Sequence, residues 1–287
     1  MPVKIKKWLP YVVIAEVAIV LVLAVLLLIR FQRPEVPETT PPTTVEETTL
    51  PEPSANVFTP MDFAYDGPYL TCLTDVSIRG IDVSTFQKEI DFHQVKDAGF
   101  EFVMIRLGYR GTEQGGLFED EWAQTNYLKA ISAGLKVGGY FFSQAISVGE
   151  AVEEANFAME IAKDWELEMP LVYDWEYVGE GYRSSHVDAR MLTDCTLAFC
   201  QTVEAAGLEA MIYFNPDQSQ KKMYLQELTD YRFWLAMYTD EMEYPYKVDM
   251  WQYTCTGTVP GVEGNVDINL YFPYPRINAP DMDVIEE

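Results

Sequence analysis

The chain has 287 residues, of which 48% are hydrophobic and 14% aromatic, enough apolar material for one large domain or two small ones. Its 45 acidic residues against 20 basic ones give a formal net charge of −25. Binding to nucleic-acid phosphates needs clustered Lys and Arg, and the sequence has no basic stripe. Nucleic acid is therefore excluded as an expected partner.

A nearly continuous apolar stretch, residues 9–29, lies close to the amino terminus and has about the length of a helix that spans a bilayer. Glu16 interrupts it, and the lysines that precede it favour a cytoplasmic amino terminus. We predict that residues 1–30 form a cytoplasmic tail and an uncleaved signal anchor in the bacterial cell membrane, with the remaining chain extracellular. A cleaved signal peptide is the alternative, and it also places the domain beyond the membrane.

A segment dominated by Pro, Thr and Glu follows, from residue 33 to residue 57. Such a composition cannot build a core, and its prolines favour an extended, semi-stiff chain. We therefore expect residues 31–71 to be a disordered linker that holds a folded domain, residues 72–287, away from the membrane.

Within the expected domain, short runs of branched and aromatic residues alternate with helical patterns. The expected strands are 79–83, 102–107, 137–142, 171–175, 210–214, 233–237, 249–253 and 266–270. The expected helices are 91–98, 118–133, 148–163 and 189–206. This alternation predicts an α/β protein with an irregular, TIM-like (β/α) barrel, because the last strands have no long helices between them. A doubly wound open sheet is the alternative.

The four cysteines include no CxxC pair and have no His nearby, so neither a metal nor another cofactor is expected. Cys195 and Cys200 lie on an expected helix, where the simplest interpretation is a pair of small buried side chains. A bridge between Cys72 and Cys255 is compatible with the sequence but is not required by it.

Four acidic residues lie at the ends of expected strands. Asp82 is at the end of the first, Asp174 and Glu176 are at the end of the fourth, and Asp267 is at the start of the eighth. In a parallel α/β barrel the chemistry takes place at the carboxyl ends of the strands. An ionised carboxylate within apolar sequence is costly unless it is paired or used in a reaction.

Asp174 and Glu176 are two residues apart, so a strand points both to the same face with Cα atoms about 7 Å apart. Two neighbouring carboxylates resist double ionisation, and one of them keeps its proton to higher pH. This division into acid and base is what glycoside hydrolysis requires. The alternatives are that the pair caps the next helix or binds a cation, because the pattern D-x-E is common.

Many aromatic residues lie on or just after the expected strands. Each of them could be a core residue, but beside four acids they indicate a groove that stacks against sugar rings. The aromatic residues in question are Tyr109, Tyr140, Tyr173, Tyr213, Trp234, Tyr238, Trp251 and Tyr253. Among them, Tyr109, Tyr140, Tyr213 and Trp251 are the predicted substrate-binding residues.

The segments "RGIDVSTFQKEIDFHQVKDAGFEFVMIRLGYRG", "GGYFFS", "PLVYDWE", "MIYFNP", "FWLAMY" and "MWQYTCTGTVPGVEGNVDINLYF" extend from Arg79 to Phe272. In these segments and in their order, the chain resembles the family 25 glycoside hydrolases, the Chalaropsis-type lysozymes. The resemblance implies an irregular α/β barrel. It also implies hydrolysis, with retention, of the β-1,4 bond between N-acetylmuramic acid and N-acetylglucosamine in peptidoglycan.

By motif match, the resemblance gives Glu176 the role of general acid. Asp174 would support an oxazolinium-like intermediate formed by the N-acetyl group of the substrate, and Asp82 and Asp267 would complete an acidic floor. The sequence departs from the family at Phe141, where members often carry His, and we expect this to alter a subsite or the proton affinity of the pair.

Two hypotheses follow from the sequence. The first is a membrane-tethered muramidase acting on peptidoglycan glycan strands. The second is a non-catalytic glycan-binding or scaffold protein that keeps the groove, and hydrolysis of a different glycan is a further alternative.

Overall fold

Eight strands form a closed ring in the computed structural model of the chain, which describes residue 50 and residues 52–273. The expected membrane-spanning stretch, residues 9–29, and much of the expected linker lie outside these residues. Among the residues that the structure describes, no helix combines the length and apolar character needed to cross a membrane.

The ring confirms the eight predicted strands and the barrel, and it contradicts the open-sheet alternative. Its members are β3 (Ile78–Val83), β4 (Phe102–Arg110), β6 (Lys136–Ser143), β7 (Leu171–Trp175), β8 (Ala210–Phe214), β9 (Arg232–Ala236), β10 (Met250–Gly257) and β11 (Val266–Tyr271). Each pairs with the next, and β3 closes the ring by pairing with both β4 and β11. All pairs are parallel except the two made by β11, which is antiparallel to β10 and to β3.

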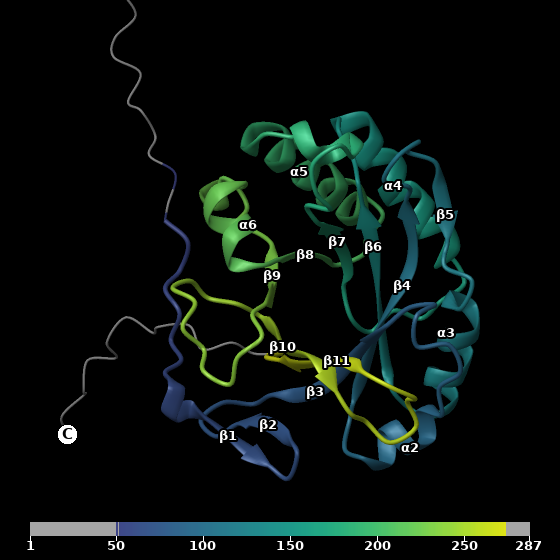
Figure 1. Cartoon of the computed structure of the whole chain (residues 1–287), viewed down its shortest axis with the longest axis vertical. Helices are drawn as coiled ribbons and strands as arrows, with labels where there is room; N and C mark the ends of the chain where they lie inside the picture. Colours follow the sequence, from purple (N-terminus) through teal and green to yellow (C-terminus); the bar gives the residue numbers. More distant parts are fainter. Residues whose placement is uncertain (1–49, 51, 274–287) are drawn as a thin grey trace, which may run out of the picture. The chain divides into compact units, whose positions relative to one another are not determined.

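Helices cover one part of the barrel only (Figure 1). The α-helices are α2 (Phe92–Asp97), α3 (Ala123–Ser132), α4 (Val148–Ile161), α5 (Ala189–Ala205) and α6 (Pro216–Lys221). The short 3-10 turns are η1 (Pro60–Asp62), η2 (Arg183–His186) and η3 (Leu225–Glu227). Helices α3, α4 and α5 pack on β4 to β8, whereas β9, β10 and β11 follow one another without an α-helix. This is the irregularity that the sequence predicted.

The helix ends follow from local sequence. Ser147 caps α4 by accepting a hydrogen bond from the Glu150 N–H, and Asp188 caps α5 in the same way. Gly134 and Gly207 have positive φ angles just after α3 and α5, a conformation that glycine adopts without strain. Helix α3 begins at residue 123 rather than 118, because β5 (Leu117–Glu119) pairs antiparallel with the end of β4.

Side chains alternate between the inside and the outside of the barrel, as strand geometry requires. The inner ones form an apolar cluster of their own, which includes Phe102, Met104, Met169, Val172, Met211, Trp234, Met250 and Tyr271. The outer ones pack under the helices; Tyr173, for example, lies 4.9 Å from Phe199 of α5, measured between ring centroids. The inner cluster fills one end of the barrel and leaves polar residues at the other.

The folded part begins earlier than predicted. Strands β1 (Phe63–Asp66) and β2 (Tyr69–Cys72) form a hairpin, and an isolated bridge joins Ala55 to Tyr246. The rings of Phe58 and Phe272 are 4.7 Å apart. The expectation that the linker extends to residue 71 is therefore wrong from residue 52 onward. The aromatic residues Phe58, Phe63 and Tyr69, which follow the Pro-, Thr- and Glu-rich segment, are buried on folding and belong to the domain.

The cysteines form no bridge. Cys72 and Cys255 are free, and Cys195 and Cys200 are buried, as expected for small apolar side chains.

Candidate active site

The four predicted acids converge at one end of the barrel. Asp82 lies near the end of β3 and Asp174 near the end of β7, while Glu176 lies one residue beyond β7. Asp267 is near the start of β11, but β11 is antiparallel, so its start lies beside the ends of the other strands. In the register of this pair, Asp267 is directly opposite Asp82. The structure thus brings all four carboxyl groups to one place.

They line a pocket of about 720 Å³, counting the space continuous with solvent. Its other lining residues are Ser84, Phe86, Gln87, Arg106, Tyr140, Phe142, Tyr213, Trp234, Tyr238 and Gln252. Tyr140 and Tyr213 therefore lie where the sequence predicted. Tyr238 and Phe86 are well exposed and offer flat apolar faces to a ligand.

Two predicted groove residues do not line the pocket. Trp251 is completely buried on the outer side of β10, where its indole N–H donates to the Met237 carbonyl at 2.8 Å. Its neighbour Gln252 points inward instead, and the tryptophan that lines the pocket is Trp234. The sequence located the strand but not which of its faces is inside.

Tyr109 is the second correction. Its ring stacks on Phe118 of β5 at 5.3 Å between centroids, and the Arg106 guanidinium lies 5.4 Å from the ring centre. Tyr109 therefore supports a pocket residue without facing the pocket. The short β5, which the sequence analysis missed, is what holds it there.

The expectation for Phe141 is also wrong. Strand β6 directs Tyr140 and Phe142 into the pocket, so Phe141 points the opposite way and is completely buried. Its ring lies 6.2 Å from that of Phe157 on α4. A residue in this position supports the packing of α4 and touches no ligand in the pocket.

Adjacent positions of β6 give a matched pair of variants. We expect Phe141→Ala to lower the free energy of unfolding by about 3–5 kcal/mol, because it leaves a cavity, with little change in KM. We expect Phe142→Ala to raise KM about tenfold, the equivalent of about 1.4 kcal/mol of lost apolar contact, at nearly unchanged stability. Denaturant unfolding and steady-state kinetics check both; a higher KM in Phe141→Ala alone would contradict the assigned faces.

Two amides that the sequence analysis missed orient Asp82. Its Oδ2 accepts a hydrogen bond from Gln252 at 2.8 Å and another from Asn269 at 2.8 Å. Tyr213 and Tyr238 donate to Gln252 Oε1 at 3.1 and 3.0 Å. Only the position of Asn269 in the sequence could have indicated that it belongs to the site. It is two residues from Asp267 and must share its face of the strand.

Burial dominates the protonation of the cluster. It raises the pKa of Asp82 to about 6, and the two amide hydrogen bonds limit the rise. Burial, with Asp82 and Glu176 nearby, raises the pKa of Asp267 to about 8. The pKa of Asp174 lies well above its ordinary value, first because of burial and then because of Glu176 and Asp82. The cluster therefore holds protons near neutral pH.

The pKa of Glu176 is raised as well, by burial and by the Asp82 charge. Arg106, the cation among the lining residues, is partly neutralised by its ion pair with Asp120 at 2.8 Å. The charge of Glu176 raises the pKa of Asp174, so ionising both carboxyl groups at once is unfavourable. One carboxylic acid and one carboxylate side by side can serve as proton donor and charge stabiliser.

The raised pKa of Asp267 predicts how stability depends on pH. The folded protein binds this proton more tightly than the unfolded chain does, so the contribution to stability is lost as pH rises from about 4 toward 8. We expect the melting temperature of the wild type to fall over this range. The melting temperature of Asp267→Asn should fall less over this range, and at pH 8 it should be higher than that of the wild type. Thermal unfolding at pH 5 and 8 checks this, and identical slopes would contradict it.

A comparison with protein families matches residues 81–262 to glycosyl hydrolases family 25. The match covers more than half of the chain, and together with the barrel and its acidic pocket it shows a glycoside hydrolase. The chain belongs to glycosyl hydrolases family 25.

Individual relatives agree with this. Lysozyme M1 of Streptomyces globisporus is 24% identical over 209 residues, which are 68% of this chain and 67% of the relative. A bacterial lysozyme from Streptomyces coelicolor has a similar structure, with a TM-score of 0.55 and 25% identity over 68% of this chain and 91% of the other. The modular autolysin LytC of Streptococcus pneumoniae, in complex with a synthetic peptidoglycan ligand, has a TM-score of 0.59 and 26% identity. That match covers 68% of this chain but only 47% of LytC.

Proposed function

We propose that the chain is a muramidase, cleaving the β-1,4 bond between N-acetylmuramic acid and N-acetylglucosamine in peptidoglycan with retention of configuration. The observation that carries this is the pairing of Asp174 with Glu176 in a pocket lined by acids and aromatic rings. The lysozyme relatives and the peptidoglycan ligand in the LytC structure support the choice of substrate.

The position of Glu176 supports its proposed role as the proton donor. It lines the acidic pocket and also a second hollow, bounded by Trp175, Tyr177, Asn215 and Lys222. A glycan extending from one hollow to the other would place its glycosidic oxygen beside this carboxyl group. The raised pKa keeps the proton on Glu176 to higher pH than on an ordinary glutamic acid, which favours general acid catalysis.

The proposed reaction runs in two steps. In the first, Glu176 protonates the leaving oxygen while the N-acetyl carbonyl oxygen of the substrate attacks C1, forming an oxazolinium ion. In the second, Glu176 takes a proton from water, which attacks C1 and restores the N-acetyl group with the β configuration. Such substrate assistance is a known exception to the scheme with two carboxylates.

Asp174 is suited to stabilise the positive intermediate. Its Oδ1 is buried and has no hydrogen-bond partner among the described residues. The N–H of the reacting N-acetyl group would be a matching donor, and its charge in the intermediate would favour the ionised form of Asp174. Asp82, with a pKa of about 6, would be ionised at neutral pH and add negative potential near the sugar. Asp267, with a pKa of about 8, would be protonated and could donate a hydrogen bond to a sugar hydroxyl.

Incubating the purified protein with peptidoglycan and identifying the new reducing ends by mass spectrometry tests the proposal. New muramic acid ends are the expected result. N-acetylglucosamine ends would assign a different bond. Binding without new ends would instead favour a non-catalytic glycan-binding protein.

We also propose that residues 9–29 tether this activity to the cell membrane, with the domain outside. The apolar length of the segment supports this. The proposal predicts that the full chain sediments with membranes and that a chain lacking residues 1–30 does not. A full chain that remains in the supernatant would contradict it.

A further inference from the structure

A hydrogen bond from outside β7 holds the main chain of Glu176. Glu176 follows the last residue of β7, Trp175, so the regular pairing of the sheet has already ended there. Its carbonyl oxygen accepts a hydrogen bond from the side-chain amide of Gln144 at 2.8 Å. Gln144 directly follows β6 and is completely buried.

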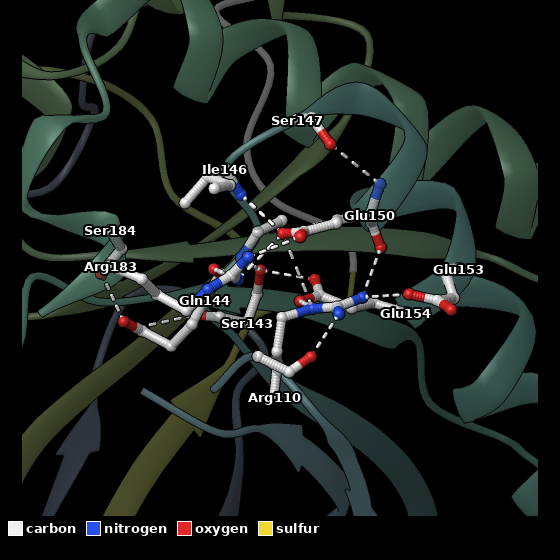
Figure 2. Close-up of polar contacts among 12 residues, drawn as sticks. Arg110, Ser143, Gln144, Ile146, Ser147, Glu150, Glu153, Glu154, Arg183 and Ser184 are labelled. Carbon is white, nitrogen blue, oxygen red and sulfur yellow. Dashed lines mark hydrogen bonds and ion pairs between the residues drawn. The ribbon is translucent and has the colours of Figure 1, made fainter. Parts of the chain in front are cut away.

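The Gln144 side chain is fixed at both ends (Figure 2). Its Nε2 also donates to the Ser143 carbonyl at 2.8 Å, and its Oε1 accepts from the Ser184 hydroxyl at 2.5 Å. The main-chain carbonyl of Gln144 accepts from Arg183 Nη1 at 2.8 Å. The amide therefore has one orientation in which every bond is satisfied.

An ionic network lies behind this amide, buried at Arg110 and Glu154 and partly exposed at Arg183 and Glu150 (Figure 2). Arg183 pairs with Glu150 at the start of α4 through two hydrogen bonds, at 2.9 and 2.5 Å. Arg110, at the end of β4, pairs with Glu154 at 2.7 Å. Glu154 in turn accepts from the Ser143 hydroxyl at 2.5 Å. The network thus joins the ends of two strands to one helix.

A contribution to stability alone is a weak explanation for such a network. Removing charges from water is costly, and apolar packing of the same volume often stabilises a fold as well or better. A charged network does fix direction and distance more narrowly than apolar contacts do. The network fixes the positions of Gln144, Ser184 and Arg183, which are connected by hydrogen bonds to the main chain of Glu176.

We propose that Gln144 is a positioning residue for Glu176, fixing the main chain from which the proton-donating side chain extends. The inference rests on the proposed function, in which Glu176 is the general acid. A general acid must lie within hydrogen-bond reach of the leaving oxygen, and a displacement of about 1 Å can cost about 100-fold in rate.

Gln144→Met tests this, because it keeps the length of the side chain and removes both polar ends. We expect kcat to fall about 10- to 100-fold while KM changes less than about threefold, because the substrate pocket itself is unaltered. The alkaline limb of the kcat–pH profile should move to lower pH. A loosened Glu176 would be better solvated and would lose part of the burial that raises its pKa. The other charged groups that line the pocket with it, Arg106, Asp82, Asp174 and Asp267, are unchanged.

Gln124→Met is the matched control. Gln124 lies on α3, and its Oε1 accepts from the Trp165 indole at 2.9 Å in a partly buried bond. Gln124 lines neither the acidic pocket nor the second hollow, so this variant loses a hydrogen bond of the same kind of amide without touching the site. It should lower the melting temperature and leave kcat and the pH profile unchanged. If Gln144→Met does not fold, Ser184→Ala removes one bond to the amide and should move kcat and the alkaline limb in the same direction, by less.

The outcomes separate the two proposals. A wild type that releases no reducing ends overturns the proposed function. Suppose instead that the wild type is active, and that Gln144→Met melts at a lower temperature but keeps the wild-type kcat and alkaline limb. That result overturns this inference alone. Ser184→Ala is judged in the same way if Gln144→Met does not fold. An equal loss of kcat in Gln124→Met would also overturn this inference.

Discussion

Glu176→Gln is expected to lower kcat for peptidoglycan hydrolysis by about 10²- to 10⁴-fold, the range that general acid catalysis contributes. The amide keeps the size of the side chain but cannot give a proton to the leaving oxygen. Folding should be unaffected or slightly improved, because the variant removes a desolvated carboxyl group beside Asp174 and Asp82. Release of reducing ends and thermal unfolding measure the two effects.

The matched control is Glu160→Gln, on α4. Glu160 is exposed and accepts a hydrogen bond from the Lys163 ammonium at 2.6 Å, and it lines neither the acidic pocket nor the second hollow. It should keep kcat within about twofold, since surface polar contacts contribute little. If Glu176→Gln retained more than about a tenth of the wild-type kcat, Glu176 would not be the proton donor.

Asp174→Asn is expected to lower kcat by about 10²- to 10³-fold, the usual cost of removing one preorganised electrostatic contact to a transition state. Asn cannot offset the positive charge of the oxazolinium ion. Its side-chain NH₂ group would also face the N–H of the substrate's N-acetyl group, from which Asp174 should accept a hydrogen bond. The wild-type protein should also fail to cleave N-deacetylated glycan, because the internal nucleophile is then missing. Kinetics on acetylated and deacetylated strands measure both effects.

Asp66→Asn is the control, because Asp66 is an exposed residue of β1 that pairs with Arg79 at 3.1 Å and lines neither hollow. It should retain the wild-type rate on both substrates. Cleavage of deacetylated strands by the wild type would instead make Asp174 a covalent nucleophile, with Glu176 unchanged in its role.

Several features were readable from sequence because they depend on neighbouring residues. Apolar runs predicted the eight strands, and helical patterns between them predicted the main helices. Asp174 and Glu176 could be recognised as a pair, since two-residue spacing on a strand fixes a common face. The barrel then followed from the alternation of strands and helices.

The residue pattern was sufficient to predict the class of fold, the four acids and their position at strand ends. Which groups meet depends on how distant segments pack. Asp82 is held by Gln252 and Asn269, which are 170 and 187 residues further along the chain. Trp234 rather than Trp251 lines the pocket, because the pairing of a strand, and not its composition, sets which of its faces points inward. Gln144 reaches the carbonyl of Glu176 only because β6 and β7 lie side by side, so its position depends on the closed barrel.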